Sequence, residues 1–298
     1  MKHAFLIMAH ANYPFLSRII KKIDHPDNAI FIHIDAKSVF TEQDKDLLNN
    51  ACKYSEVCFI DRYKISWGGY SITNCQLRLL ETATPHKFDY YHFLSGADFL
   101  IKPMHYFRDF FAEHNGYEFV HFCTEDFVRK QYGRVAQYHF FRDLCGRDRK
   151  NPLLWINAAA VIFQRKILRV NRLKAFPDFE LKCGSQWCSI THGFAEYLLS
   201  KESIIRKMFK FSSCSDELFL QTILHASPFA EHVYSSNMRS IDWSRGDPSK
   251  GSPYTYTIED YDLLINSENL ICRKVTDQTP EGEALIKKLE NIGVPSKQ

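Results

Sequence analysis

Short apolar runs alternate with amphipathic stretches along the first hundred residues. The apolar runs have the length of buried strands and lie at residues 4–9, 29–35, 57–60 and 90–94. Between them, the apolar spacing predicts helices that open at Pro14 and that cover about 41–51 and 70–83. Strands alternating with helices predict an α/β fold with a mostly parallel central sheet flanked by helices. Right-handed crossovers bring the carboxyl ends of such strands to one edge, where ligands bind.

The later part of the chain is less regular. We expect strands over 118–122 and 270–275, and helices near 193–199, over 215–225 and over about 280–292. The polar and aromatic segment 124–151 has no clear periodicity, and residues 143–150 within it are typical of an exposed loop. No linker long enough to separate two domains is found, so we expect one domain over residues 1–298.

Composition excludes several classes of protein. An aromatic content of 14% argues against a disordered chain, and 38 basic against 35 acidic residues argue against a nucleic-acid partner. Nine cysteines, an odd number without a CxxC pair, favour a reducing compartment and no zinc. The apolar run 4–9 is too short for a signal peptide, and no run approaches a membrane span. We therefore expect a soluble, cytoplasmic protein.

Polar residues at predicted strand ends are the first candidates for a binding site. His33 and Asp35 end the second strand, and Asp98 follows Ser95 and Gly96 after the fourth. If the strands are parallel, these residues share one crevice, which suits a nucleotide or a sugar. Ser, Gly and Asp are also common turn formers, so each strand end alone favours a turn. Two such ends on one rim favour a turn and a binding site about equally.

Two adjacent carboxylates, Asp216 and Glu217, stand at a predicted helix start. With Ser215 as N-cap, acidic residues in the first turn suit the helix dipole, which is the structural alternative. The functional alternative makes Glu217 a general base that takes a proton from a sugar hydroxyl.

Three cations near the C-terminus could stabilise a diphosphate if they converge: Arg239, Arg273 and Lys274. Walker and GxGxxG motifs are missing, which disfavours P-loop and Rossmann enzymes. The two Asp-x-Asp triplets, 44–46 and 260–262, fall in predicted surface helices, and we interpret both as solvated charge. This pattern favours a diphosphate held by Arg and Lys over one held by a metal.

Seven segments in order resemble the core-2/I-branching N-acetylglucosaminyltransferase family, which includes the peptide xylosyltransferases. They are AFLIMAHANYPFLSRII, AIFIHIDAKS, YYHFLSGADFLIK, GSQWCSITHGFAEYLL, SCSDELFLQTIL, RSIDW and LICRKV. The resemblance implies a GT-A-like α/β fold and an inverting, metal-independent transfer from a UDP-sugar. It also implies a compact bacterial member without the membrane anchor and stem of Golgi relatives. A half 1–122 would bind the nucleotide sugar, and a half 123–298 would carry acceptor and catalytic groups.

The resemblance also implies roles for single residues. Glu217 matches the catalytic base, Arg239 the diphosphate-binding arginine and Lys274 its partner. The expected nucleotide or donor residues are His33, Asp35, Trp67, Gly68 and Asp98, and Trp187 and Asp216 are expected on the acceptor side. The segment 124–150 is the least matched, and there Arg129, Arg134, Tyr138 and His139 either contact an acceptor or belong to an ordinary loop.

The leading hypothesis is transfer of N-acetylglucosamine to a glycan or glycolipid hydroxyl during bacterial surface polysaccharide or lipooligosaccharide synthesis, with no metal or other cofactor. Alternatives are the donors UDP-xylose, UDP-glucose and UDP-galactose, a metal-dependent retaining transferase, or a non-catalytic carbohydrate- or nucleotide-binding protein. Lipid-linked acceptors are compatible with peripheral contact at the inner face of a membrane. The sequence does not define the oligomeric state.

Overall fold

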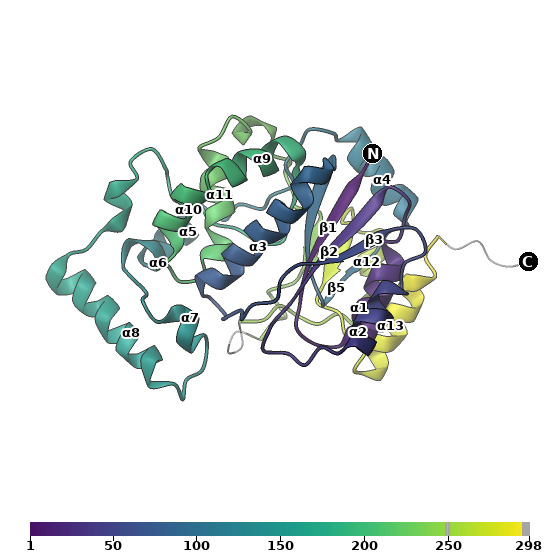
Figure 1. The fold of residues 1–298 in the computed structure, drawn as a ribbon, viewed down its shortest axis with the longest axis horizontal. Coiled ribbons are helices and arrows are strands. Elements are labelled where there is room, and N and C mark those ends of the chain that lie inside the picture. The colour runs from purple at the N-terminus through teal and green to yellow at the C-terminus, as the bar shows by residue number, and fades with distance from the viewer. Residues whose placement is uncertain (248, 250, 294–298) are drawn as a thin grey trace, which may run out of the picture.

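A five-stranded sheet of order β3-β2-β1-β4-β6 forms the centre of the computed structural model, which describes residues 1–247, 249 and 251–293 (Figure 1). The strands are β1 (His3–Ala9), β2 (Asn28–Ile34), β3 (Glu56–Phe59), β4 (Tyr90–Ser95) and β6 (Ser189–Thr191). The first four are parallel, and β6 runs antiparallel to β4. The predicted α/β fold with a mostly parallel sheet and flanking helices is confirmed.

A second, three-stranded sheet has the order β5-β8-β7. Its strands are β5 (Asp98–Leu100), β7 (Arg239–Ile241) and β8 (Ile271–Arg273). Because β5 follows β4 after only Gly96 and Ala97, the turn at the end of β4 joins the two sheets. Asp98 therefore lies where the carboxyl end of the central sheet meets the second sheet.

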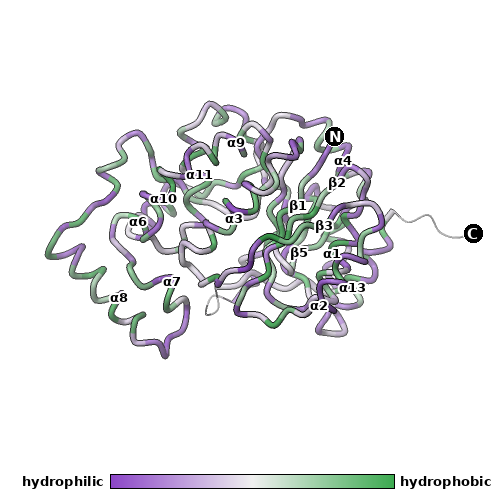
Figure 2. The backbone as a smooth tube through the Cα atoms, viewed as in Figure 1, coloured by the Kyte–Doolittle hydropathy of each residue, from purple (hydrophilic) through white to green (hydrophobic). Residues whose placement is uncertain are grey.

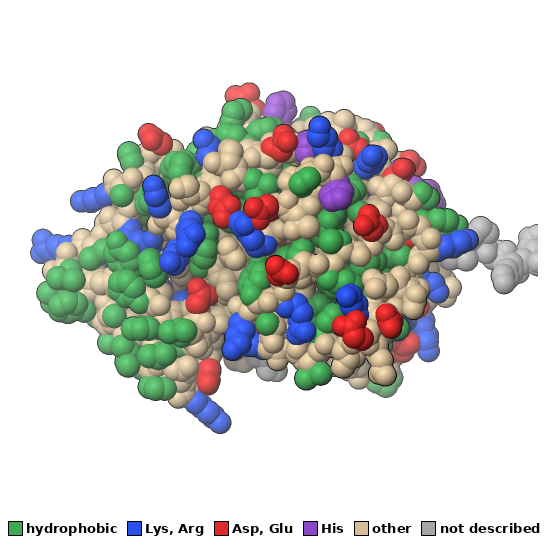
Figure 3. Space-filling model, in the orientation of Figure 1, with side chains coloured by type: hydrophobic (Ala, Val, Ile, Leu, Met, Phe, Trp, Pro, Cys, Tyr) green, Lys and Arg blue, Asp and Glu red, His purple; other side chains and the backbone are tan. Residues whose placement is uncertain are grey.

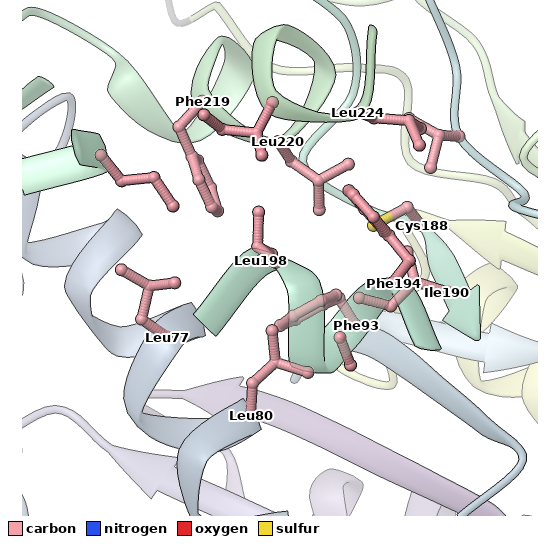
Figure 4. Packing of buried hydrophobic residues seen from close by; sticks show 14 of the residues in the cluster. Leu77, Leu80, Phe93, Cys188, Ile190, Phe194, Leu198, Phe219, Leu220 and Leu224 are labelled. Carbon is pink, nitrogen blue, oxygen red and sulfur yellow. The ribbon is translucent and has the colours of Figure 1, made fainter. Parts of the chain in front are cut away.

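Both faces of the central sheet are buried, since successive strand side chains point to opposite sides. Phe5, Ile7 and Ile30 pack on one side with α1 (Tyr13–Lys22), α2 (Glu42–Asn49), α4 (Met104–Glu113), α12 (Tyr261–Asn266) and α13 (Pro280–Glu290). Leu6, Phe31 and Phe93 pack on the other side with α3 (Tyr70–Ala83), α9 (His192–Ser200), α10 (Glu202–Phe209) and α11 (Phe219–His225). Figure 4 shows how Leu77 of α3, Leu198 of α9 and Phe219 of α11 converge in this second cluster.

Several predicted elements differ from the observed ones. The strand expected over 118–122 is wrong: Glu118 and Phe119 form only isolated bridges, to Val233 and Ser189. The helix expected over 215–225 begins with a separate 3-10 turn, because the left-handed Cys214 (φ 52°) precedes it and Leu218 (φ −129°) interrupts it. Ser215 is therefore not the N-cap; its hydroxyl pairs with that of Thr73 at 2.8 Å. The 3-10 turns are Thr84–His86, Arg172–Ala175, Ser215–Glu217, Ala230–His232 and Ile258–Asp260.

The segment without clear periodicity folds into short helices at one end of the molecule. They are α5 (Glu125–Gln131), α6 (Gly133–Ala136) and α7 (Arg142–Cys145), so the first part of the loop expected over 143–150 is helical. The longer α8 (Pro152–Phe163) follows and continues as a π turn, Gln164–Leu168; the sequence analysis did not predict it. Figure 1 shows α8 at the edge of the molecule opposite α13, and Figure 2 shows its hydrophobic composition.

Two general expectations concern cysteines and membranes. All nine cysteines are free thiols, six of them buried. Among the described residues, no helix is both long and apolar enough to cross a bilayer.

Gly184 tests the packing between three loops, which contain His121, Gly184 and Glu217. A Cβ at this position would lie 1.7 Å from the His121 carbonyl oxygen, and the Gly184 amide donates to the Glu217 carbonyl at 2.9 Å. Gly184→Ala is expected to cost on the order of 3 kcal/mol of stability, measured by thermal unfolding. The control is Gly96→Ala, whose Cβ would meet Ala9 at 3.4 Å and which is expected to change stability by about 1 kcal/mol or less. Equal unfolding temperatures for the two variants would contradict this account of the packing.

Candidate active site

Glu217 lies on a short loop that is fixed to the Trp67–Gly68 turn. The Cys214 amide donates to the Gly68 carbonyl at 2.8 Å. Gly68 has φ 69°, and a Cβ there would lie 3.1 Å from Cys214 Sγ, so the close approach requires glycine. The loop and the turn, which are far apart in sequence, therefore form one unit.

The Glu217 carboxylate is 40% exposed and is oriented by Arg134. Arg134 Nη1 donates to Glu217 Oε2 at 2.7 Å, and the Arg134 carbonyl accepts from the Ser213 amide at 2.9 Å. One arginine thus holds both the backbone and the carboxylate of the Glu217 loop. An incoming hydroxyl group can still reach the exposed carboxylate.

Asp216 is buried, in contrast to its neighbour. Its side chain is enclosed, and its Oδ1 has no hydrogen-bond partner among the described residues. Burial, together with the nearby charge of Glu217, raises the pKa of Asp216 to about 7. The two adjacent carboxyl groups therefore differ in environment, and only Glu217 is open to solvent.

A second polar cluster gathers around Asp98, where the two sheets meet. Asp98 is 2% exposed and accepts from the Ser95 amide at 2.7 Å and from Arg273 Nη1 at 2.7 Å. The Arg273 guanidinium lies over the Trp187 ring, 4.4 Å from its centroid. Asp98 and Trp187 therefore fix the guanidinium of Arg273 in position.

Lys274 adds a second cation to this cluster. Its Nζ donates to Ser252 Oγ at 2.9 Å. Burial lowers the pKa of Lys274, and the charges of Arg273 and Arg147 lower it further, while Asp98 opposes them. Partly buried cations this close favour the binding of an anion, which relieves their repulsion.

Arg147 connects the two clusters. Its guanidinium carbon lies 3.5 Å above the centroid of the Trp67 ring, and a terminal nitrogen donates to the Gly251 carbonyl at 3.3 Å. Burial lowers the pKa of Arg147, and the charge of Glu217 acts on it in the opposite direction. Arg147 thus contacts Trp67, beside the Gly68 carbonyl that holds the Glu217 loop, and Gly251, beside the Ser252 that accepts from Lys274.

Arg239, which is expected to hold a diphosphate together with Lys274, lies inside the protein. Arg239 is 7% exposed, and its guanidinium donates to the carbonyls of Asn237 and Cys188 and to Ser189 Oγ. These bonds hold β7 against β6 inside the protein, while Nε of the same guanidinium has no hydrogen-bond partner among the described residues. Of the three cations considered from the sequence, Arg273 is the one that lies with Lys274 in the cluster around Asp98.

His33 and Asp35 lie at the carboxyl end of β2, but they face the protein's own loop. His33 is buried, burial lowers its pKa, and its Nε2 accepts from the Tyr63 amide at 3.3 Å. Asp35 Oδ1 accepts from the amides of Lys37 at 2.9 Å and Ile65 at 3.3 Å. Both residues therefore order the segment that leads to Trp67.

Two further candidates, Tyr138 and His139, have structural contacts instead of an open face. The Tyr138 backbone exchanges hydrogen bonds with the Gln164 amide group at 2.8 and 2.9 Å. The two His139 ring nitrogens contact the Gly133 carbonyl at 3.1 Å and Asn157 Nδ2 at 3.4 Å. These residues attach α8 to the body of the protein.

The remaining charged candidates also have local partners. Arg129 is exposed and pairs with Glu125 and Asp126 of its own helix. Asp44 caps α2, as expected of a surface helix. Asp260, however, is buried and accepts from Arg245 Nη1 at 2.8 Å, so its interpretation as solvated charge is wrong.

Comparison with known proteins identifies the family. The family model described as Core-2/I-Branching enzyme matches residues 3–264. The chain belongs to the Core-2/I-Branching enzyme family. This agrees with the resemblance carried by the seven sequence segments.

Similar family members include xylosyltransferases. Xylosyltransferase 1 of Homo sapiens is 26% identical over 255 residues, which cover 81% of this chain and 24% of the relative. Xylosyltransferase sqv-6 of Caenorhabditis elegans is 24% identical over 260 residues, which cover 82% of this chain and 29% of the relative. The chain thus spans roughly a quarter of the length of these relatives.

Among solved structures, the chain is similar to mouse xyloside xylosyltransferase 1 in its apo form. The TM-score is 0.41 at 10% identity, covering 93% of this chain and 99% of that chain. A second similar structure is Staphylococcus aureus TarS 1-349, with a TM-score of 0.27 at 18% identity, covering 38% of this chain and 33% of that chain.

Asp216 predicts a specific pH dependence of stability. Its folded pKa of about 7 exceeds the unfolded value of 3.8, so the folded state binds more protons between these values. Stability should therefore fall as pH rises from about 4 to 7. Asp216→Asn removes this contribution, and the unfolding temperature of the variant is expected to exceed that of the wild type by about 5 °C at pH 8 but not at pH 4. The exposed Asp178→Asn is the control, and parallel curves for wild type and Asp216→Asn would contradict the account.

Proposed function

We propose that the chain is an inverting glycosyltransferase that moves a sugar from a UDP-sugar to a glycan hydroxyl without a metal ion. The observation that carries the proposal is the juxtaposition of a solvent-accessible carboxylate with a cation cluster. Arg147 stacks on Trp67, which precedes Gly68, and the Gly68 carbonyl holds the Glu217 loop. Arg147 also donates to the Gly251 carbonyl, next to Ser252, which accepts from Lys274. General-base chemistry needs the carboxylate, and a departing diphosphate needs the cations.

The proposed reaction is a single displacement. The acceptor hydroxyl oxygen attacks the anomeric carbon and forms the new glycosidic bond, while the bond from that carbon to the UDP oxygen breaks. The hydroxyl proton passes to Glu217, and the electron pair of the broken bond leaves with UDP. Arg273 and Lys274 stabilise the negative charge that grows on the diphosphate. Because attack and departure occur on opposite faces of the sugar carbon, the product has inverted configuration.

The Asp98 contacts support a cation-held diphosphate. The carboxylate accepts from the Ser95 amide and hydroxyl and from Arg273, so it orients a guanidinium. We therefore expect activity in the presence of a chelator. A metal-dependent retaining transferase would instead lose activity and give the opposite stereochemistry.

The donor sugar has two candidates. N-acetylglucosamine follows from the resemblance to the branching enzymes, and xylose is favoured by the names of the similar relatives. A panel of UDP-sugars with EDTA present, read out as UDP release, distinguishes them. Release from one donor in EDTA supports the proposal and identifies the sugar, whereas release only with added manganese would contradict the metal-free mechanism.

Glu217→Gln tests the proposed base. The amide keeps the shape but cannot accept the proton, so transfer is expected to fall by roughly 100- to 10,000-fold. The dissociation constant of UDP, measured by calorimetry, should change by less than about three-fold, because Glu217 does not hold the diphosphate. The exposed Glu231→Gln is the matched control. Transfer by Glu217→Gln at the control rate would remove Glu217 from the mechanism.

Lys274→Ala tests the proposed diphosphate site. Loss of the ammonium is expected to lower kcat by about 100- to 1,000-fold and to weaken UDP binding by at least roughly ten-fold. The exposed Lys21→Ala serves as the charge-matched control, and thermal unfolding shows whether each variant is folded. A folded Lys274→Ala variant with normal UDP affinity would overturn the assignment.

A further inference from the structure

Helix α8 is built with its apolar side chains outward. Of the exposed large hydrophobic residues, six lie in α8 and the π turn that continues it: Trp155, Ile156, Ile162, Phe163, Ile167 and Leu168. Each is at least 52% exposed. Figure 3 shows the resulting cluster of hydrophobic atoms at the end of the molecule that α8 occupies. A contiguous apolar surface of this kind on a folded protein marks an interaction site.

The uncharged polar residues of the same segment face the protein. Asn157 and Gln164, seven positions apart, are its buried residues, with 5% and 6% exposure. The Asn157 side chain accepts from the Phe141 amide at 3.4 Å, and Gln164 exchanges two hydrogen bonds with the Tyr138 backbone. The arrangement is the reverse of an ordinary surface helix, in which the apolar stripe faces the core. Hydrogen bonds hold α8 to the body of the protein, and its apolar side is exposed. Contact with an apolar medium would bury that side.

Cations border the apolar surface at both ends. Residues 149–177 contain seven Lys or Arg and no Asp or Glu. Arg149 and Lys150 precede α8, and Arg165 and Lys166 follow it; within the described part of the chain, none of these four forms an ion pair. A hollow of about 470 Å³ beside the π turn is lined by Arg129, Lys130, Arg165 and Arg169 together with polar and small residues. This border suits anionic groups.

We propose that α8 and its π turn form a membrane-surface anchor that inserts its apolar side into an anionic lipid bilayer. Lipid supplies the apolar medium, and its headgroups supply the negative charge for the cationic border. A twelve-residue helix is about 18 Å long, too short to span a bilayer, so it would lie in the interface. The Trp155 indole N–H already donates to the Arg149 carbonyl at 3.2 Å, which leaves its exposed ring free to enter the interface.

A second copy of the chain fits this surface less well. A symmetric contact would bring identical patches together and set their cationic borders against each other. On an anionic bilayer the same cations face negative headgroups, so attraction replaces this repulsion. The loop from α7 to α8 also contains Arg147, which stacks on Trp67, so this loop connects α8 to the candidate active site. The anchor does not rest on the proposed transferase activity.

Vesicle binding tests the anchor without any sugar donor. The full chain is sedimented with vesicles of phosphatidylcholine alone or of phosphatidylcholine and phosphatidylglycerol in a ratio of about 7 to 3. We expect binding to the anionic vesicles to be at least roughly ten-fold tighter than to the neutral ones. No binding to either vesicle, or equal binding to both, would overturn the proposal.

Two variants locate the binding surface. Ile162→Asp with Phe163→Asp is expected to weaken anionic-vesicle binding by at least about ten-fold, whereas Val39→Asp with Leu263→Asp, at exposed apolar positions elsewhere, is not. Arg165→Glu with Lys166→Glu is expected to weaken anionic-vesicle binding. The control, Lys21→Glu with Lys64→Glu, changes the net charge by the same amount and is expected to bind normally. Unchanged binding by the Ile162/Phe163 variant would overturn the proposal.

Trp155 reports insertion directly. Brominated lipids in the anionic vesicles should quench its fluorescence, and Trp155→Phe should bind normally but lose that quenched component. Analytical ultracentrifugation without lipid tests whether the apolar surface instead binds a second copy of the chain. A dimer that Ile162→Asp with Phe163→Asp makes monomeric, together with no vesicle binding, would assign the surface to a second copy and overturn the anchor. Circular dichroism and thermal unfolding confirm that each variant is folded.

Discussion

The ion pair between Asp98 and Arg273 is the interaction on which the candidate site depends. Asp98 begins β5 and Arg273 ends β8, so their 2.7 Å contact links neighbouring strands of the second sheet. The Ser95 amide, at the end of β4, donates to the same carboxylate at 2.7 Å and ties this sheet to the central one. Removing either partner would leave a nearly buried charge uncompensated, which is strongly destabilising. The ion pair also holds Arg273 over Trp187 and thereby sets the position of the next residue, Lys274.

From this edge, the site extends to Glu217 through short polar contacts. Arg147 stacks on Trp67, Gly68 accepts from the Cys214 amide, and Arg134 orients the carboxylate. The cations and the acid thus belong to separate rigid segments that meet at the Trp67 turn. This separation is what a displacement reaction requires, because the proton and the leaving diphosphate depart in different directions.

The sequence predicted the fold better than the site. Apolar periodicity located the four parallel strands and α3, since packing on both faces of the sheet imposes that pattern. It failed at 118–122, where two isolated bridges replace a strand, and at α8, whose apolar residues face outward. At the site, the sequence indicated the cations Arg239, Arg273 and Lys274, but it could not tell that Arg239 is buried against the Cys188 carbonyl, or that Arg273 pairs with Asp98. Such distinctions depend on register and burial, which a single sequence does not encode locally.

A crystal structure of the protein with UDP, grown in EDTA, tests the central claim most directly. The account predicts diphosphate oxygens within hydrogen-bond distance of Lys274 Nζ and the Arg273 guanidinium, with the Glu217 carboxylate facing the space beyond the terminal phosphate. A diphosphate bound away from Lys274, or one held by Arg239 after rearrangement of β7, would contradict it.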